Sequence, residues 1–144
     1  MQRVIIELPS QKIFSCTIPI RITDINYGKH LGNDAVLSIL HEARVQYLAS
    51  FGCTELEVGG VSLVMADAMI EFKQQGFYGD VLHVQLFIGS INRAGFDLYY
   101  SLNTIRNNKD ILITKAKTGM VCFDYTTQKV VSIPLKLKEQ LRKQ

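Results

Sequence analysis

The segment from residue 23 to residue 32, TDINYGKHLG, and the residues just after it hold most of the side chains that could carry out catalysis. His30 could polarise a bond or shuttle a proton near neutral pH. Asn26 could orient a water or donate a hydrogen bond, but a neutral amide cannot act as a base or form an anhydride. Asp34 and Glu42 follow, and either carboxylate could be a general base. These residue types could take part in acid–base chemistry.

Other chemistries lack their sequence signals. The chain contains no Gly-x-Ser-x-Gly elbow, phosphate-binding loop or dinucleotide fingerprint. His41 and His83 have no cysteine or carboxylate at the spacing of metal ligands. We therefore predict neither a metal site nor a cofactor.

The elements on either side of the polar segment must position these groups. Alternation over residues 15–22 predicts a half-buried strand, and Pro19 places that strand at a sheet edge. Asn33 or Asp34 can cap a helix that runs to about Phe51, where Gly52 ends it.

The predicted helix has two different faces. At about 100° per residue its apolar side chains form one stripe. This stripe comprises Val36, Leu40, Ala43, Tyr47 and Phe51. Glu42 falls on the opposite face, which could meet a partner subunit.

After the helix, the hydrophobic period is two. Residues 61–73 alternate, with Val64, Ala66, Ala68, Ile70 and Phe72 on one face and Met65, Asp67, Met69 and Glu71 on the other. Three more strands are predicted, beginning near residues 80, 96 and 111, with turns at 92–95 and 107–110. A short amphipathic helix follows Pro134. The order is one strand, one long helix and four antiparallel strands, an α+β layered fold.

Length and composition limit the protein class. The chain of 144 residues predicts one domain, residues 1–144, and its 47% hydrophobic and 20% charged residues are ordinary globular usage. The net charge of +3 gathers in residues 129–144, so no nucleic-acid partner is predicted, and no apolar run could span a membrane. Three unpaired cysteines and the lack of a signal peptide favour a cytoplasmic location.

The run from Arg21 to Asn33 resembles, without gaps, the signature of hotdog-fold acyl-CoA thioesterases of the 4-hydroxybenzoyl-CoA thioesterase type. That signature reads Arg, two residues, Asp, any residue, Asp, three residues, His, an apolar residue, Asn, Asn. Further similar features are Glu42-Ala43-Arg44, Gly79-Asp80 and the run 123–127 before Ile133-Pro134. The resemblance covers about residues 13–141. It implies a five-stranded antiparallel sheet wrapped around one long central helix.

One departure concerns the chemistry. The second Asp of the signature, the base or nucleophile in the family, corresponds to Asn26 here. Related hotdog thioesterases place the carboxylate on the central helix, so Glu42 is the replacement that the resemblance implies, with Asp34 as the other candidate. Asp24 corresponds to the supporting Asp, which fixes the loop, and His30 braces the loop or takes part directly.

The resemblance also implies where a substrate would bind. The substrate is an acyl thioester of coenzyme A or of acyl carrier protein. Backbone amides around Lys29 to Leu31, at the helix entrance, are expected to hold the thioester oxygen. The nucleotide phosphates are expected to meet Arg93, Lys29 or the basic tail. The sites would lie at the interface of a homodimer, and dimers could pair into a homotetramer.

Two other functions remain open from the sequence. Asn26 is compatible with a catalytically silent protein that binds acyl thioesters. Asp24, Asn26 and His30 also approach the motif of hotdog enoyl-thioester hydratases, Asp, any residue, Asn, Pro, any residue, His. The Asp-to-His separation is six instead of five, however, and Tyr27 replaces Pro.

Overall fold

The computed structural model describes residues 1–143. Its elements, in chain order, are β1 (Lys12–Pro19), a short 3-10 turn (Ile22–Asp24), α1 (Asn33–Ala49), β2 (Ser62–Phe72), β3 (Val81–Ile91), β4 (Gly95–Arg106), β5 (Lys109–Asp124), β6 (Lys129–Val130) and α2 (Leu135–Leu141).

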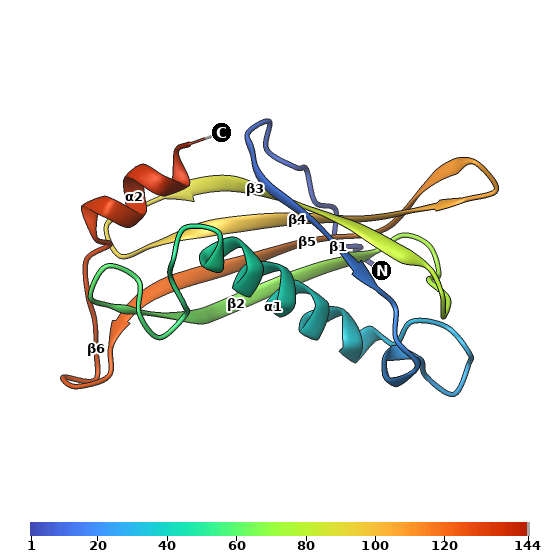
Figure 1. Cartoon of the computed structure of the whole chain (residues 1–144), viewed down its shortest axis with the longest axis horizontal. Coiled ribbons are helices and arrows are strands. Elements are labelled where there is room, and N and C mark those ends of the chain that lie inside the picture. The colour runs from blue at the N-terminus through green and yellow to red at the C-terminus, as the bar shows by residue number, and fades with distance from the viewer. Residues whose placement is uncertain (144) are drawn as a thin grey trace.

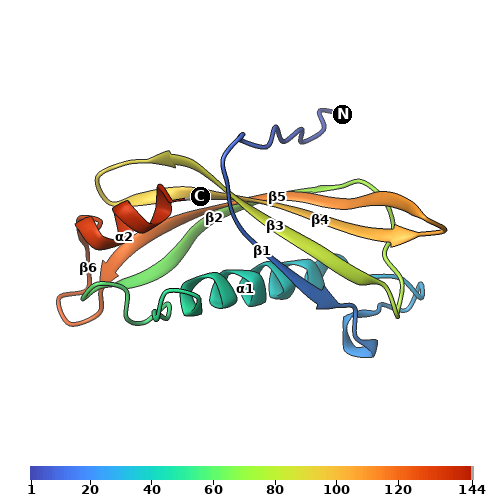
Figure 2. The ribbon, with the colours of Figure 1, turned by 45° about the horizontal axis from the view of Figure 1, so that its top comes forward.

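The strands form one antiparallel sheet in the order β1-β3-β4-β5-β2, and the two-residue β6 pairs with β5. The sheet curves around α1, which lies along its concave face, while the N-terminal residues cross the opposite, convex face (Figures 1 and 2). This is the hotdog fold, so the predicted α+β class and architecture are confirmed. Only the short β6 was not predicted.

The core lies between α1 and the sheet. Val36, Leu40, Ala43 and Tyr47 of the predicted stripe are buried there, and Glu42 is exposed on the other side of the helix, as predicted. Phe51 is only partly buried because the helix ends at Ala49.

The predicted helix cap is wrong. The N-cap residue is Gly32, with an extended backbone, and no side chain caps the helix. Asn33 is already helical because the Gly32 amide donates to the Asp24 carbonyl oxygen at 2.9 Å, which draws the chain into the helix one residue earlier.

Strand β1 ends before the predicted limit. Pro19 is its last residue, and β1 lies at the sheet edge, as predicted. Ile22 is exposed instead of facing inward, because it belongs to a turn closed by the hydrogen bond from the Arg21 amide to the Asp24 carboxylate, at 2.8 Å.

Strand β2 contains a bulge that the alternation did not predict. Met65 pairs with Met120 and Asp67 pairs with Gly119, so Ala66 is the extra residue. Because a bulge shifts the pleat by one residue, Met65 faces α1 with Ala68, Ile70 and Phe72. The predicted placement of Met65 with Asp67 is therefore wrong. Asp67 faces the convex side, where Lys117 donates to it at 2.9 Å.

Candidate active site

A buried carboxylate fixes the entry to the polar loop. Asp24 is 4% exposed, and its oxygens accept hydrogen bonds from the backbone and the guanidinium of Arg21. The Asp24 carbonyl also accepts the amide of Gly32. Asp24 therefore closes the loop at both ends, which is the supporting role expected for it.

Asn26 organises the tip of the loop. Its Oδ1 accepts the amide of Gly28 at 2.9 Å and that of His30 at 3.4 Å. Its backbone pairs with the backbone of His30 and Lys29, and Lys29 has a left-handed conformation with φ of 68°. Since Oδ1 is used by the turn, the Nδ2 group is the part of the Asn26 amide that remains for a ligand.

The predicted oxyanion donors are used within the protein. The Lys29 amide donates to the Asn26 carbonyl at 3.0 Å, and the Leu31 amide donates to the Gly76 carbonyl at 2.7 Å. Within residues 1–143, the amides of Asn33 and Asp34 have no acceptor, as expected in the first turn of a helix without a side-chain cap. Free backbone donors therefore lie at Asn33 and Asp34, just after the segment Lys29 to Leu31.

Asp34 lies beside Asn26. A methyl group placed on Gly32 would be 2.7 Å from Oδ1 of Asp34 and 3.6 Å from Cβ of Asn26. The Asp34 carboxylate and the Asn26 side chain therefore lie close to the same point. The Asp34 side chain is exposed and binds no group of the described chain. The loop therefore brings a carboxylate, an amide and two free backbone donors to the start of α1.

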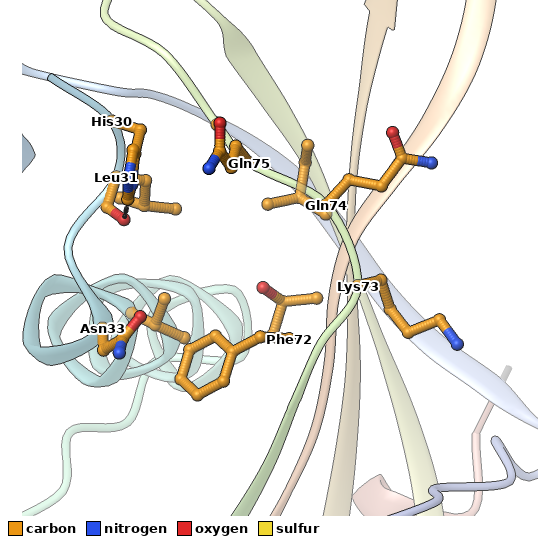
Figure 3. Close-up of a pocket in the computed structure, with 11 residues that line it drawn as sticks. His30, Leu31, Asn33, Phe72, Lys73, Gln74 and Gln75 are labelled. Atoms are coloured by element: carbon orange, nitrogen blue, oxygen red, sulfur yellow. Dashed lines mark hydrogen bonds between the residues drawn. The ribbon is translucent and has the colours of Figure 1, made fainter. Parts of the chain in front are cut away.

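A pocket of about 190 Å³ opens between this loop and the segment that joins β2 to β3. Figure 3 shows His30, Leu31 and Asn33 on one side, Lys73, Gln74 and Gln75 on the other, and the Phe72 ring beside Asn33. The remaining lining residues are Val36, Gly76, Ile113 and Thr114. Nδ1 of His30 lies 3.5 Å from the Leu31 carbonyl, so the histidine contacts both the loop and the pocket.

The β2 side of this pocket was missed in the sequence. Phe72 was predicted only as one residue of an alternating strand, and no role was predicted for Gln74 and Gln75. The available signal was the Gln-Gln-Gly sequence, in which Gly76 lets the connection approach the loop. A side chain at Gly76 would lie 2.8 Å from Ile20 and 3.3 Å from Leu31.

Glu42 lies in a different groove. It follows Asn33 by nine residues, about 13 Å along the helix axis at the usual rise per residue. There it borders a groove of about 480 Å³ between β1 and α1, and Gln46 donates to its Oε2 at 2.8 Å. Burial, and then the negative charge of Glu42, raise the pKa of the Cys16 thiol on β1. Within one subunit the structure does not bring Glu42 to Asn26.

Arg93 lies at the other end of the sheet. Its Nη1 donates to Oγ of Ser132 at 3.0 Å, next to the segment that leads to α2. Figure 1 shows the β3–β4 turn and α2 at one end of the molecule and the loop before α1 at the other. Arg93 and Lys29 therefore cannot bind the same group within one subunit.

Two further findings concern metal binding and membrane-spanning helices. In residues 1–143 no three His, Cys, Asp or Glu side chains gather as a metal site would need. Nor is any helix of that part of the chain long and apolar enough to cross a membrane.

With the hotdog fold and this loop in place, comparison with known proteins defines the family. The model of the thioesterase-like superfamily matches residues 20–141. A 1,4-dihydroxy-2-naphthoyl-CoA hydrolase of Microcystis aeruginosa is 32% identical over 109 residues, covering 74% of this chain and 76% of that protein. The chain belongs to the thioesterase-like superfamily, which confirms the resemblance read from residues 21–33.

Solved structures show the same fold. A 1,4-dihydroxy-2-naphthoyl-CoA thioesterase from Synechocystis has a TM-score of 0.78 at 22% identity, covering 89% of this chain and 94% of that one. An Asp-to-Asn mutant of a 4-hydroxybenzoyl-CoA thioesterase, complexed with 4-hydroxybenzoyl-CoA, has a TM-score of 0.79 at 18% identity, covering 89% and 97%.

Proposed function

We propose that this protein hydrolyses an acyl-CoA thioester at the N-terminus of α1. The observation that carries the proposal is the meeting of Asn26, Asp34 and the free amides of Asn33 and Asp34 beside a pocket. Membership of the thioesterase-like superfamily supports the choice of a thioester as the group that binds there.

In the proposed mechanism, the thioester oxygen accepts hydrogen bonds from the amides of Asn33 and Asp34. These donors lie at the positive end of the α1 dipole and are fixed before the reaction, so they stabilise the oxyanion as it forms. The acyl group then lies in the pocket next to Phe72, and His30 forms part of the wall.

Asp34 and Asn26 would act together on the water molecule that attacks the thioester. Nδ2 of Asn26 donates to the water and orients it, while Asp34 takes a proton as the water oxygen bonds to the carbonyl carbon. Collapse of the tetrahedral intermediate breaks the carbon–sulfur bond, and the leaving thiolate takes the proton from Asp34. A carboxylate at position 34 thus replaces the one that the family carries at position 26.

Glu42 is the alternative base, but it could join this site only from a second copy of the chain. The same holds for Arg93 as a ligand of the nucleotide phosphates. In this alternative a homodimer shares Glu42 or Arg93 across a composite site. Lys29 is the predicted phosphate ligand that a single subunit places next to the loop.

The acyl group we propose is compact and aromatic. The pocket is smaller than the roughly 300–1,000 Å³ usual for ligand sites. It offers the Phe72 ring for stacking, and Gln75 and Thr114 for hydrogen bonds to ring oxygens. Both a similar protein and a similar structure are named as acting on 1,4-dihydroxy-2-naphthoyl-CoA, so a hydroxyaryl thioester is our first choice of substrate.

The test is a hydrolysis screen with the wild-type protein over benzoyl-, hydroxybenzoyl-, dihydroxynaphthoyl- and C2 to C16 straight-chain CoA thioesters, read by release of free thiol. We expect kcat/KM to be highest for a hydroxyaryl substrate. Saturable binding without turnover would instead support the silent binding protein that Asn26 makes possible. The hydratase alternative is disfavoured, because both carboxylate oxygens of Asp24 are bound by Arg21.

A further inference from the structure

The turn between β2 and β3 exposes two adjacent aromatic side chains. Phe77 is 40% exposed and Tyr78 is 65% exposed. Neither takes part in the core cluster. Adjacent exposed rings form an apolar patch, and apolar patches on a protein surface often mark binding sites.

This turn is rigid. Oδ2 of Asp80 accepts the Phe77 amide at 2.9 Å and Nη2 of Arg106 at 2.6 Å, and the Phe77 carbonyl accepts the Asp80 amide at 3.0 Å. Gly79 supplies the left-handed conformation, with φ of 94°. The backbone that carries the two rings is therefore fixed before any ligand binds.

A guanidinium group covers one side of the Phe77 ring. Cζ of Arg106 lies 4.9 Å from the ring centroid, within the range of a cation–π contact. The same Nη2 that binds Asp80 also donates to the Gln75 carbonyl at 3.2 Å. Arg106 thus joins the aromatic turn to the residue that lines the pocket.

The turn continues the proposed active site. Gly76 precedes Phe77 directly, lines the pocket, and accepts the Leu31 amide at 2.7 Å. Figures 1 and 2 both show the β2–β3 connection beside the loop that precedes α1. That loop carries the exposed Lys29. Two exposed aromatic side chains and a cation therefore lie on the two segments that border the pocket.

We infer that Phe77 and Tyr78 stack on the adenine of coenzyme A and that Lys29 attracts its phosphates. The inference rests on the proposed function and deepens it, because it selects CoA over a carrier protein as the group that carries the acyl chain. Aromatic side chains bind nucleobases through their faces without needing base-specific hydrogen bonds. A carrier protein offers the pantetheine arm but no nucleobase, so these rings would have nothing to stack on.

The test compares two substrates with the same acyl group, one on CoA and one on pantetheine. For Tyr78→Ala we expect KM for acyl-CoA to rise about 10-fold, with kcat unchanged and acyl-pantetheine unaffected. Tyr125→Ala is the matched control, because Tyr125 is similarly exposed but packs on Phe123, on the β5–β6 turn. Lys29→Asn, which tolerates the left-handed backbone, should raise KM for acyl-CoA and reduce its salt dependence.

Equal effects of Tyr78→Ala on both substrates, or no effect on either, would overturn the inference. If neither substrate is hydrolysed, the proposed function fails, and titration calorimetry with CoA alone still tests the subsite. Weaker CoA binding by Tyr78→Ala than by Tyr125→Ala would then support it, and equal binding would overturn it.

Discussion

At the scale of residues, this chain carries the amide of Asn26 where the family carries a carboxylate, and the difference leaves the shape of the loop intact. Its Oδ1 accepts the amides of Gly28 and His30, and one oxygen of an aspartate could accept the same two bonds. What the exchange removes is the proton acceptor. Asp34 is then an exposed carboxylate that the loop brings close to residue 26 in the same subunit.

The first prediction separates the two candidate bases. Asp34→Asn should lower kcat about 100-fold or more while KM stays similar, because a general base commonly contributes a factor of 10² to 10⁴. Glu42→Gln is the matched change in the other groove and should leave kcat within a few-fold of wild type. The reverse result would assign the base to Glu42 of a second copy.

The second prediction concerns Asn26→Asp. A second carboxylate close to Asp34 would repel it, so one of the two would hold its proton to higher pH. We expect turnover to fall at about pH 6 and to recover as pH rises, which a pH–rate profile of both proteins would show. A gain of activity at every pH would mean instead that wild type lacks a working base and that position 26 supplies it.

At the scale of elements, a buried polar network joins α1 to the sheet and to the segment that follows the helix. The Arg44 side chain is only 7% exposed, and its Nε donates to Oε2 of Glu55 at 2.7 Å. Its Nη1 donates to Oη of Tyr100 at 3.2 Å, and that hydroxyl shares a 2.7 Å hydrogen bond with Thr118. The arginine of the Glu-Ala-Arg sequence therefore holds the helix in register.

The third prediction follows from this network. Arg44→Met should lower the free energy of unfolding by about 3 kcal/mol, because the mostly buried Glu55 carboxylate loses its arginine and keeps the contact with the exposed His41. Tyr100→Phe removes one hydroxyl and should cost about 1 kcal/mol. Urea denaturation measures both values. Equal losses would mean that the Arg44–Glu55 pair contributes little to stability.

The N-terminal residues make a contact with the sheet that the sequence did not predict. Ile6 is 2% exposed on the convex face of the sheet. Its amide donates to Glu71 at 3.0 Å, and Lys115 donates to its carbonyl at 2.6 Å. The hydrogen bond from Ile6, together with Lys73 and Lys115, lowers the pKa of the Glu71 carboxyl.

The fourth prediction is the pH dependence of this contact. Because the folded pKa of Glu71 is below its unfolded value of about 4.3, its contribution is complete above that value and is lost as pH falls through the folded pKa. Hydrogen exchange at the Ile6 amide should therefore stay slow from pH 7 to about 5 and lose protection only in stronger acid. Glu71→Gln should remove this acid dependence, and an unchanged profile in that variant would contradict it.

The sequence predicted those elements in which burial of one face sets the hydrophobic period. The α1 stripe and the inward residues of β3 and β4 follow from spacing alone, since each meets the same core along its whole length. The β2 bulge did not follow, because it depends on the Asp67 carboxylate reaching the Gly119 amide at 2.9 Å, a contact 52 residues away in sequence. The β2 wall of the pocket was missed because it, too, depends on contacts between segments that are distant in sequence.

At the scale of the whole molecule, the sheet has two free edges, β1 and β2. The β2 edge is 11 residues long and exposes three large apolar side chains, Met65 at 45%, Met69 at 43% and Phe72 at 52%. A long apolar edge with unpaired backbone groups is prone to pair with another chain. Pairing of β2 with β2 of a second copy would cover this edge and bring a second subunit to the open side of the pocket.

The last prediction is therefore a homodimer through β2. Wild type should sediment as a dimer at micromolar concentration, and Met65→Lys should sediment as a monomer, because the paired edge would have to bury an ammonium group next to Leu37 of α1. Leu135→Lys is the control, since Leu135 is 69% exposed on α2, and this variant should remain dimeric. Circular dichroism checks that both variants fold. We also expect monomeric Met65→Lys to lose most of its turnover, because the pocket next to Phe72 would stay open to water. A wild type that sediments as a monomer, or a fully active monomeric variant, would show that one subunit forms the complete site.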